Sequence, residues 1–175
     1  DPGNGRLSEI VIKPDDEEQH RSEEPIGSFD QYILCTSQVP TRLITAYTTT
    51  PYHVFGSYGS FTLRIGHRSP VLARLFQTTS QYEAVFITAE NPFSQTATDA
   101  ENMERLEDLR RELSALSQSV FEGEGQGLDP AWPAEKSYLA LGIPPHVARA
   151  LGERYQQNAI VWVGEDAIPR LILLR

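Results

Sequence analysis

The sequence predicts a single α+β domain in which about three helices pack on a mixed or mostly antiparallel sheet. Three observations predict this class. Short apolar runs of strand length alternate with a few helical patterns along the chain. Some strands are joined by short turns, as in β-hairpins, whereas single crossovers carry the helices. The predicted order is β-β-α-β-α-β-β-α-β-β, and 175 residues is the length of one ordinary domain.

The first 28 residues differ in composition from the rest of the chain. Among residues 1–30, nine residues are acidic and three are basic, so this segment carries −6 of the total formal charge of −9. A segment with so little apolar surface cannot offset the entropy that it would lose on ordering. We therefore expect a disordered acidic tail at residues 1–28 and one domain at residues 29–175.

The first expected elements are a short segment of undecided type and a β-hairpin. Residues 41–47 form too short a window to distinguish a helix capped by Thr41 from a strand. Two strands then flank a glycine-containing turn, at residues 52–55 and 60–65. The second strand alternates apolar and polar side chains, as a half-buried strand does.

Three helices are predicted from their start signals. Ser69 followed by proline matches an N-cap and the first helical position, for a helix that ends near residue 76. Thr98 and Glu101 match a capping box, and leucines three and four residues apart extend this helix to about residue 118. A proline pair at residues 144–145 begins the third helix, which ends near residue 155.

The remaining strands are short apolar runs bounded by polar or glycine-rich segments. The run at residues 83–88 is almost wholly apolar, as expected of a central strand. The last two runs are separated by a turn at residues 164–166, which predicts a closing hairpin. The runs after residue 88 lie at residues 120–123, 137–141, 159–163 and 170–174.

Composition and missing motifs exclude several function classes. The acidic balance argues against binding to nucleic acid or to an anionic membrane, and its sign fits a basic partner protein or a cationic ligand better. The partners that we consider are therefore a basic protein or a small polar ligand. The single cysteine, Cys35, excludes an internal disulfide and is read as a buried apolar residue. No phosphate loop, dinucleotide fingerprint, catalytic signature or histidine pair at metal-ligand spacing is present. We expect no cofactor or metal and a cytoplasmic location, and whether the chain is an enzyme is left open.

The first candidate site follows the predicted central strand. Thr88, Asn91 and Ser94 offer donors and acceptors where this strand ends, and Asn102 lies on the helix that follows. Such strand ends often gather ligand contacts, and free amides near residues 98–101 could face an anion. In the alternative interpretation, these side chains only satisfy loop backbone and Asn102 only supports the loop.

The second candidate site is formed by two later segments. Trp132 lies in a proline-containing loop and is expected to fold back onto the domain. Glu135 precedes one strand, and Gln157 and Asn158 precede another. If those strands are neighbours, one carboxylate and two amides converge on one side of the sheet. Glu135 could then be a general base, although a buried polar network that fixes strand order explains the pattern equally well.

These segments carry a resemblance to a known family. From about residue 42 to residue 174, the chain resembles DUF3293, a bacterial family of unknown function. The resemblance implies one domain and a bacterial origin, and it implies no reaction. Tyr155-Gln156 stands where relatives usually have Phe-Gly. The residues that carry the resemblance are Tyr47, Leu63-Arg64-Ile65-Gly66, Phe86-Ile87-Thr88-Ala89-Glu90-Asn91-Pro92, Asn102, Trp132-Pro133-Ala134-Glu135-Lys136-Ser137 and Gln157-Asn158-Ala159.

Three hypotheses about function follow from the sequence. The first is a small binding or regulatory domain with a polar pocket at the strand ends. The second is an acidic interaction module, such as an inhibitor or immunity-type partner of a basic protein. The third is an enzyme that uses Glu135 as general base. The candidate ligand-binding residues are Thr88, Asn91, Ser94, Asn102, Glu135 and Gln157.

Overall fold

The computed structural model of the chain describes residues 37–57 and 59–175. The predicted acidic tail, the start of the domain at residue 29 and Cys35 lie outside the described residues. With α2 and the short η1 set aside, the elements follow the predicted order. They are α2 (Thr41–Thr49), β1 (Tyr52–Gly56), β2 (Gly59–Leu63), α3 (Pro70–Thr79), β3 (Ala84–Thr88), the 3-10 helix η1 (Pro92–Ser94), α4 (Asp99–Leu116), β4 (Val120–Gly125), β5 (Glu135–Leu141), α5 (Pro145–Arg154), β6 (Ala159–Val163) and β7 (Pro169–Leu173).

The strands form one sheet with the order β2-β1-β4-β5-β3-β6-β7. Every pairing in it is antiparallel, which confirms the predicted α+β class. β3 lies between β5 and β6 and is buried along almost its whole length, as expected of a central strand. The described part of the chain contains four α-helices, one more than predicted, and none of them combines the length and apolar character needed to cross a bilayer.

The additional helix is α2, the segment whose type the sequence left undecided. The helix ends before Thr50, whose backbone is extended because a proline follows. Thr41 is not its cap, which corrects one of our predictions. Pro40 occupies the N-cap position, so Thr41 is already the first helical residue and lies one position too late to cap. Among the described side chains, the hydroxyl of Thr41 is the only buried polar atom without a hydrogen-bond partner.

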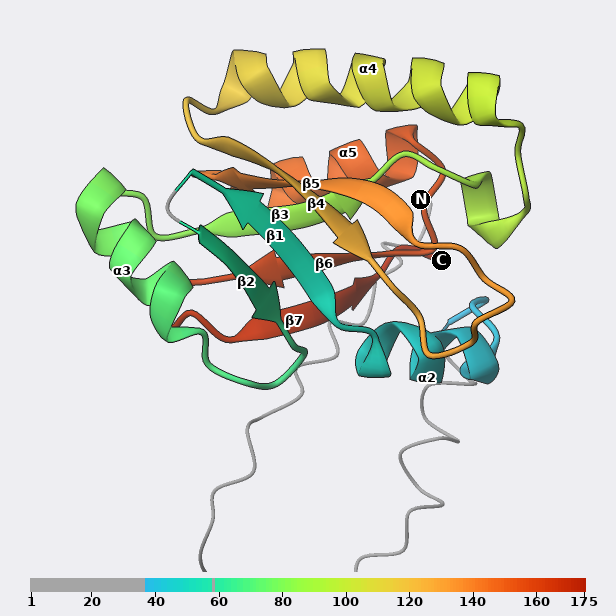
Figure 1. Cartoon of the computed structure of the whole chain (residues 1–175), viewed down its shortest axis with the longest axis horizontal. Helices are drawn as coiled ribbons and strands as arrows, with labels where there is room; N and C mark the ends of the chain where they lie inside the picture. The colour runs from blue at the N-terminus through green and yellow to red at the C-terminus, as the bar shows by residue number, and fades with distance from the viewer. Residues whose placement is uncertain (1–36, 58) are drawn as a thin grey trace, which may run out of the picture.

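The four helices cover the two faces of the sheet (Figure 1). Side chains alternate along β3, so Phe86 faces one core cluster while Val85 and Ile87 face the other. The Phe86 cluster contains Ile44 of α2 and two apolar residues of α3. The other cluster contains Leu106, Leu109 and Leu113 of α4 together with apolar residues of α5. Each face is therefore buried under its own pair of helices.

The sheet curls around the core cluster that contains Phe86. The segment after β2 reaches β7, where the amide of Gly66 donates to the carbonyl of Pro169 at 2.9 Å. Near it, the amide of Ser69 donates to the carbonyl of Ala167 at 2.9 Å. These bonds join the two edges of the sheet and enclose the cluster. Under α2 the interior is not filled by side chains, and a cavity remains there.

A glycine in β4 permits the close packing inside this curl. A Cβ atom on Gly123 would lie 2.4 Å from the carbonyl oxygen of His53 and 2.8 Å from the ring of Phe86. We predict that Gly123→Ala lowers the free energy of unfolding by about 2 kcal/mol or more, because backbone and ring would both have to shift. Urea denaturation measures this loss. The control is Gly127→Ala in the β4–β5 loop, where no atom lies within 4 Å, and equal losses in both variants would contradict the packing argument.

Candidate functional site

The curled face of the sheet contains a cavity of about 650 Å³ under α2. Phe86, Val161 and Leu171 give it an apolar floor, and its rim comes from α2, η1 and the β4–β5 loop. Cavities of this size and character are typical of small-molecule sites. Five of the six predicted site residues line it, namely Thr88, Asn91, Ser94, Glu135 and Gln157.

Strand pairing places the polar residues of β3 and β5 side by side. Thr88, the last residue of β3, lies opposite Ser137 of β5. Because side chains alternate along a strand, Glu135 and Ser137 share the face that holds Leu139 and the cavity. The neighbouring Tyr138 packs against the opposite cluster. The carboxylate of Glu135 therefore enters the cavity from the first residue of its strand.

Asn91 connects this carboxylate to α4. Its Nδ2 donates to Oε1 of Glu135 at 2.8 Å, and its Oδ1 accepts from Nδ2 of Asn102 and from the amide of Ala97, each at 3.1 Å. Oδ1 of Asn102 accepts from the amide of Asn91 at 2.9 Å. Asn102 is buried and does not line the cavity. It positions Asn91, as the alternative interpretation of its role expects.

The start of α4 is satisfied by its own side chains. Thr98 and Glu101 form the predicted capping box, in which the amide of Glu101 donates to the Thr98 hydroxyl at 3.2 Å. Asp99 adds a second carboxylate to the first turn. Two negative charges at this helix end disfavour an anion there, so the amides near residues 98–101 are not part of the candidate site.

Thr88 and Gln157 are held mainly by backbone groups. The Thr88 hydroxyl donates to the carbonyl of Lys136 at 2.6 Å. Nε2 of Gln157 donates to the carbonyls of Glu90 and Tyr155, each at 3.1 Å. We had expected the Gln157 side chain to meet Glu135 if their strands were neighbours, but β3 lies between β5 and β6. Gln157 instead supports residue 90, beside the asparagine that contacts the carboxylate.

Glu135 is a partly buried carboxylate with neutral partners. Burial raises its pKa above the ordinary value of 4.5, and hydrogen bonds from Asn91 and Trp132 oppose this rise. The pKa of Glu90 is raised too, first by burial and then by repulsion from Glu135. Within residues 37–57 and 59–175, no Arg, Lys or His side chain forms an ion pair with Glu135. Its negative charge is left without a cationic counterpart there.

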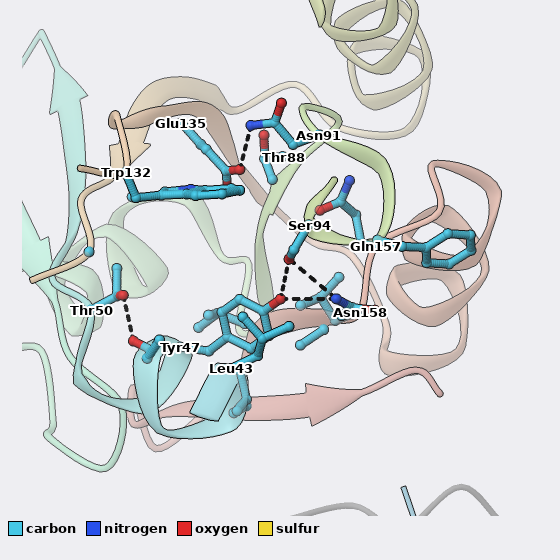
Figure 2. A pocket seen from close by; sticks show the side chains of 18 of the residues that line it. Leu43, Tyr47, Thr50, Thr88, Asn91, Ser94, Trp132, Glu135, Gln157 and Asn158 are labelled. Carbon is cyan, nitrogen blue, oxygen red and sulfur yellow. Dashed lines mark hydrogen bonds between the residues drawn. The ribbon is translucent and has the colours of Figure 1, made fainter. Parts of the chain in front are cut away.

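Trp132 folds back onto the domain, as predicted from its loop. Its side chain is partly buried and lines the cavity. Figure 2 shows the indole edge-on, with the Glu135 carboxylate at one end of it and Tyr47 across the open space. One face of the indole is therefore turned toward the cavity.

The cavity contains a second cluster of polar side chains, which the sequence predicted only in part. Tyr47 and Ser94 share a hydrogen bond of 2.5 Å between their hydroxyls, and Nδ2 of Asn158 donates to both oxygens, at 3.1 and 3.2 Å. Figure 2 shows the three side chains converging from α2, η1 and the segment before β6. Ser94 was among the predicted site residues. Tyr47 was missed as a site residue because the sequence did not show that its segment is a helix facing the cavity.

The hydrogen atoms of this hydroxyl pair do not all have acceptors. Tyr47 and Ser94 carry two hydroxyl hydrogens, and one of them is used in the bond between them. Asn158 cannot accept the other, because its amino group points at the pair and its Oδ1 accepts from Arg175 at 3.2 Å. The pair therefore keeps one donor for a further group.

One family model matches part of the chain. The family model described as a protein of unknown function (DUF3293) matches residues 87–160. No curated protein and no solved structure gives a significant match. The matched segment runs from the end of β3 to β6 and contains Asn91, Glu135 and Gln157. The resemblance to this family predicted from the sequence is confirmed for residues 87–160.

Proposed function

We propose that the cavity under α2 binds a small polar ligand and that the domain acts as a binding or regulatory module. The observation that carries this proposal is a cavity of ligand size whose polar groups keep unused hydrogen-bonding capacity. Polar groups withdrawn from water cost free energy unless they are paired. The carboxylate of Glu135 and the hydroxyl pair of Tyr47 and Ser94 are partly withdrawn from water in this way. A bound ligand would offset the lost free energy by forming hydrogen bonds with them.

Binding is better supported than catalysis by the neighbours of Glu135. A general base requires a reacting group within hydrogen-bond reach and usually a second polar group that orients it. The groups on Glu135 are the side chains of Asn91 and Trp132, neither of which is a nucleophile or an acid. The hypothesis of an acidic interaction module stays a prediction, because the tail on which it depends lies outside the described residues.

The first prediction for this site separates the stability contributed by the hydrogen bonds of the Asn91 side chain from the cost of its left-handed backbone. Asn91 has a left-handed backbone with φ of 48°, and its side chain makes three hydrogen bonds. We expect Asn91→Ala to lower the free energy of unfolding by about 2–4 kcal/mol, because buried partners lose their bonds. Asn91→Gly removes the same bonds without backbone strain, so it should lose about 1 kcal/mol less. Chemical denaturation of both variants measures the two contributions, and equal losses would show that backbone strain adds nothing.

The second prediction concerns pH. A carboxyl group whose folded pKa is raised binds its proton more tightly in the folded state. Its stabilising contribution is therefore complete below pH 4.5 and is lost as pH rises through the raised pKa of Glu135. We expect stability to fall less steeply above pH 4.5 in Glu135→Gln than in the natural chain, as measured by denaturation across this range.

Glu101→Gln is the control for this pH profile. Hydrogen bonds from Thr98 lower the pKa of Glu101, so its contribution is present above pH 4.5 and is lost as pH falls. The slope above pH 4.5 should therefore match that of the natural chain. A natural chain and a Glu135→Gln variant with parallel profiles would show that Glu135 is not held in an unfavourable environment.

The third prediction tests ligand binding directly. We expect fragments found in a screen by amide NMR to shift resonances of residues 88–94 and 132–137. Ser94→Ala and Trp132→Ala should each weaken binding of these fragments about tenfold, which corresponds to one lost hydrogen bond or ring contact. Ser114→Ala, on the exposed side of α4, is the matched control and should leave the affinity unchanged. If no fragment shifts the cavity residues, the polar groups form a structural network only.

A further inference from the structure

We propose that the ligand of this cavity is a small organic cation that also carries a hydrogen-bond acceptor. This inference rests on the proposed function and specifies the chemistry of the same site. The cationic nitrogen lies between the Glu135 carboxylate and the face of Trp132. The acceptor lies at the hydroxyl pair of Tyr47 and Ser94, and an apolar body spans the floor between the two.

The charge of Glu135 is the first argument. A carboxylate withdrawn from water is ordinarily paired with a cation, because neutral donors compensate only part of its lost hydration. Asn91 supplies one neutral donor at 2.8 Å, and Trp132 supplies another. Glu90 adds repulsion instead of compensation. An ammonium or amidinium group on a ligand would complete the environment of the carboxylate.

The aromatic wall is the second argument. The indole of Trp132 turns one face to the cavity beside the carboxylate (Figure 2). Tyr52 also lines the cavity, and its ring packs edge-on against Phe86 with centroids 5.2 Å apart. The face of an indole attracts a cation through its quadrupole, most strongly where water is excluded. A carboxylate and an indole face together therefore select a positively charged nitrogen over a neutral one.

The end of the cavity formed by Tyr47 and Ser94 offers hydrogen-bond donors, whereas the Glu135 end offers an acceptor. The hydroxyl pair keeps one hydrogen that has no acceptor among the described residues. Arg175 lines the cavity too; it donates to Oδ1 of Asn158 and stacks on Phe93, with its guanidinium carbon 4.3 Å from the ring centroid. Donors and positive charge at this end suit a carbonyl or other acceptor oxygen.

The test uses compounds of one shape and different charge. Benzamidine, benzamide and benzoate present a planar cation, a neutral amide and an anion on the same ring. We expect benzamidine to bind about tenfold or more tightly than benzamide, as one charge-assisted hydrogen bond requires, and benzoate to bind most weakly. Amide NMR titration of the full chain gives each affinity and shows whether the shifts lie at residues 88–94 and 132–137.

Two variants test which end of the ligand binds at Glu135 and which end binds at the hydroxyl pair. Glu135→Gln should remove the preference for benzamidine, whereas Glu124→Gln removes the same charge from β4 outside the cavity and should change the affinity less than twofold. A second cation, 4-amidinobenzamide, adds a carbonyl at the far end of the ring. It should bind more tightly than benzamidine, and in the double variant Tyr47→Phe/Ser94→Ala, which removes both hydroxyl hydrogens, the two compounds should bind equally.

The outcomes distinguish this inference from the proposed function. If benzamide or benzoate shifts the cavity residues as strongly as benzamidine, the cavity binds ligands but its specificity for a cation is refuted. The same conclusion follows if Glu135→Gln leaves the preference intact. If neither these compounds nor any fragment of a general screen shifts the cavity residues, both the inference and the proposed function fail.

Discussion

The side chain of Asn91 joins three separate parts of the fold, and the shape of the cavity depends on its hydrogen bonds. Its oxygen is held by α4 and by the amide of Ala97, and its nitrogen donates to Glu135 at the start of β5. The residue adopts a left-handed backbone, which asparagine tolerates better than most residues. This turn allows the chain to leave β3 and deliver Ser94 back to the cavity. One amide thus fixes both the carboxylate and the loop beside it.

The core supports this arrangement from two sides. One apolar cluster fills the curl of the sheet, and the other lies under α4 and α5, so the fold does not depend on the cavity for its stability. Each strand that supplies a polar residue is anchored by apolar residues farther along the same strand. In β5, for example, Ser137 lines the cavity, and Leu139, two residues farther along the same face, is fully buried in the core. Unpaired polar groups can be tolerated at one end of such a sheet because the remaining core outweighs their cost.

Most of the fold followed from local signals, whereas the site required long-range geometry. Apolar runs and capping residues such as Ser69 and Thr98 predicted element order because each acts within a few residues. The type of α2 could not be decided, because nine residues of mixed propensity take their structure from packing against the sheet. The placement of β3 between β5 and β6 depends on pairing across the whole chain. Asn91 and Glu135 were predicted to share one pocket because polar side chains at strand ends often gather ligand contacts, but Tyr47 gave no such signal.

Two asparagines set the polarity of the cavity by the same device. The oxygens of Asn91 and Asn158 are each occupied by a donor, from Asn102 of α4 and from Arg175 respectively. Each amino group is therefore forced to donate inward, to the carboxylate in one case and to the hydroxyl pair in the other. Donation to a carboxylate favours its charged form, so Asn91 opposes the effect of burial on Glu135 and keeps that end an acceptor. Donation to the hydroxyls consumes their lone pairs and leaves a hydrogen, so Asn158 makes the other end a donor. The two ends would lose this difference if either amide group were free to rotate. The oxygen of Asn91, turned inward, would repel the carboxylate of Glu135. The oxygen of Asn158, turned inward, would accept the remaining hydroxyl hydrogen.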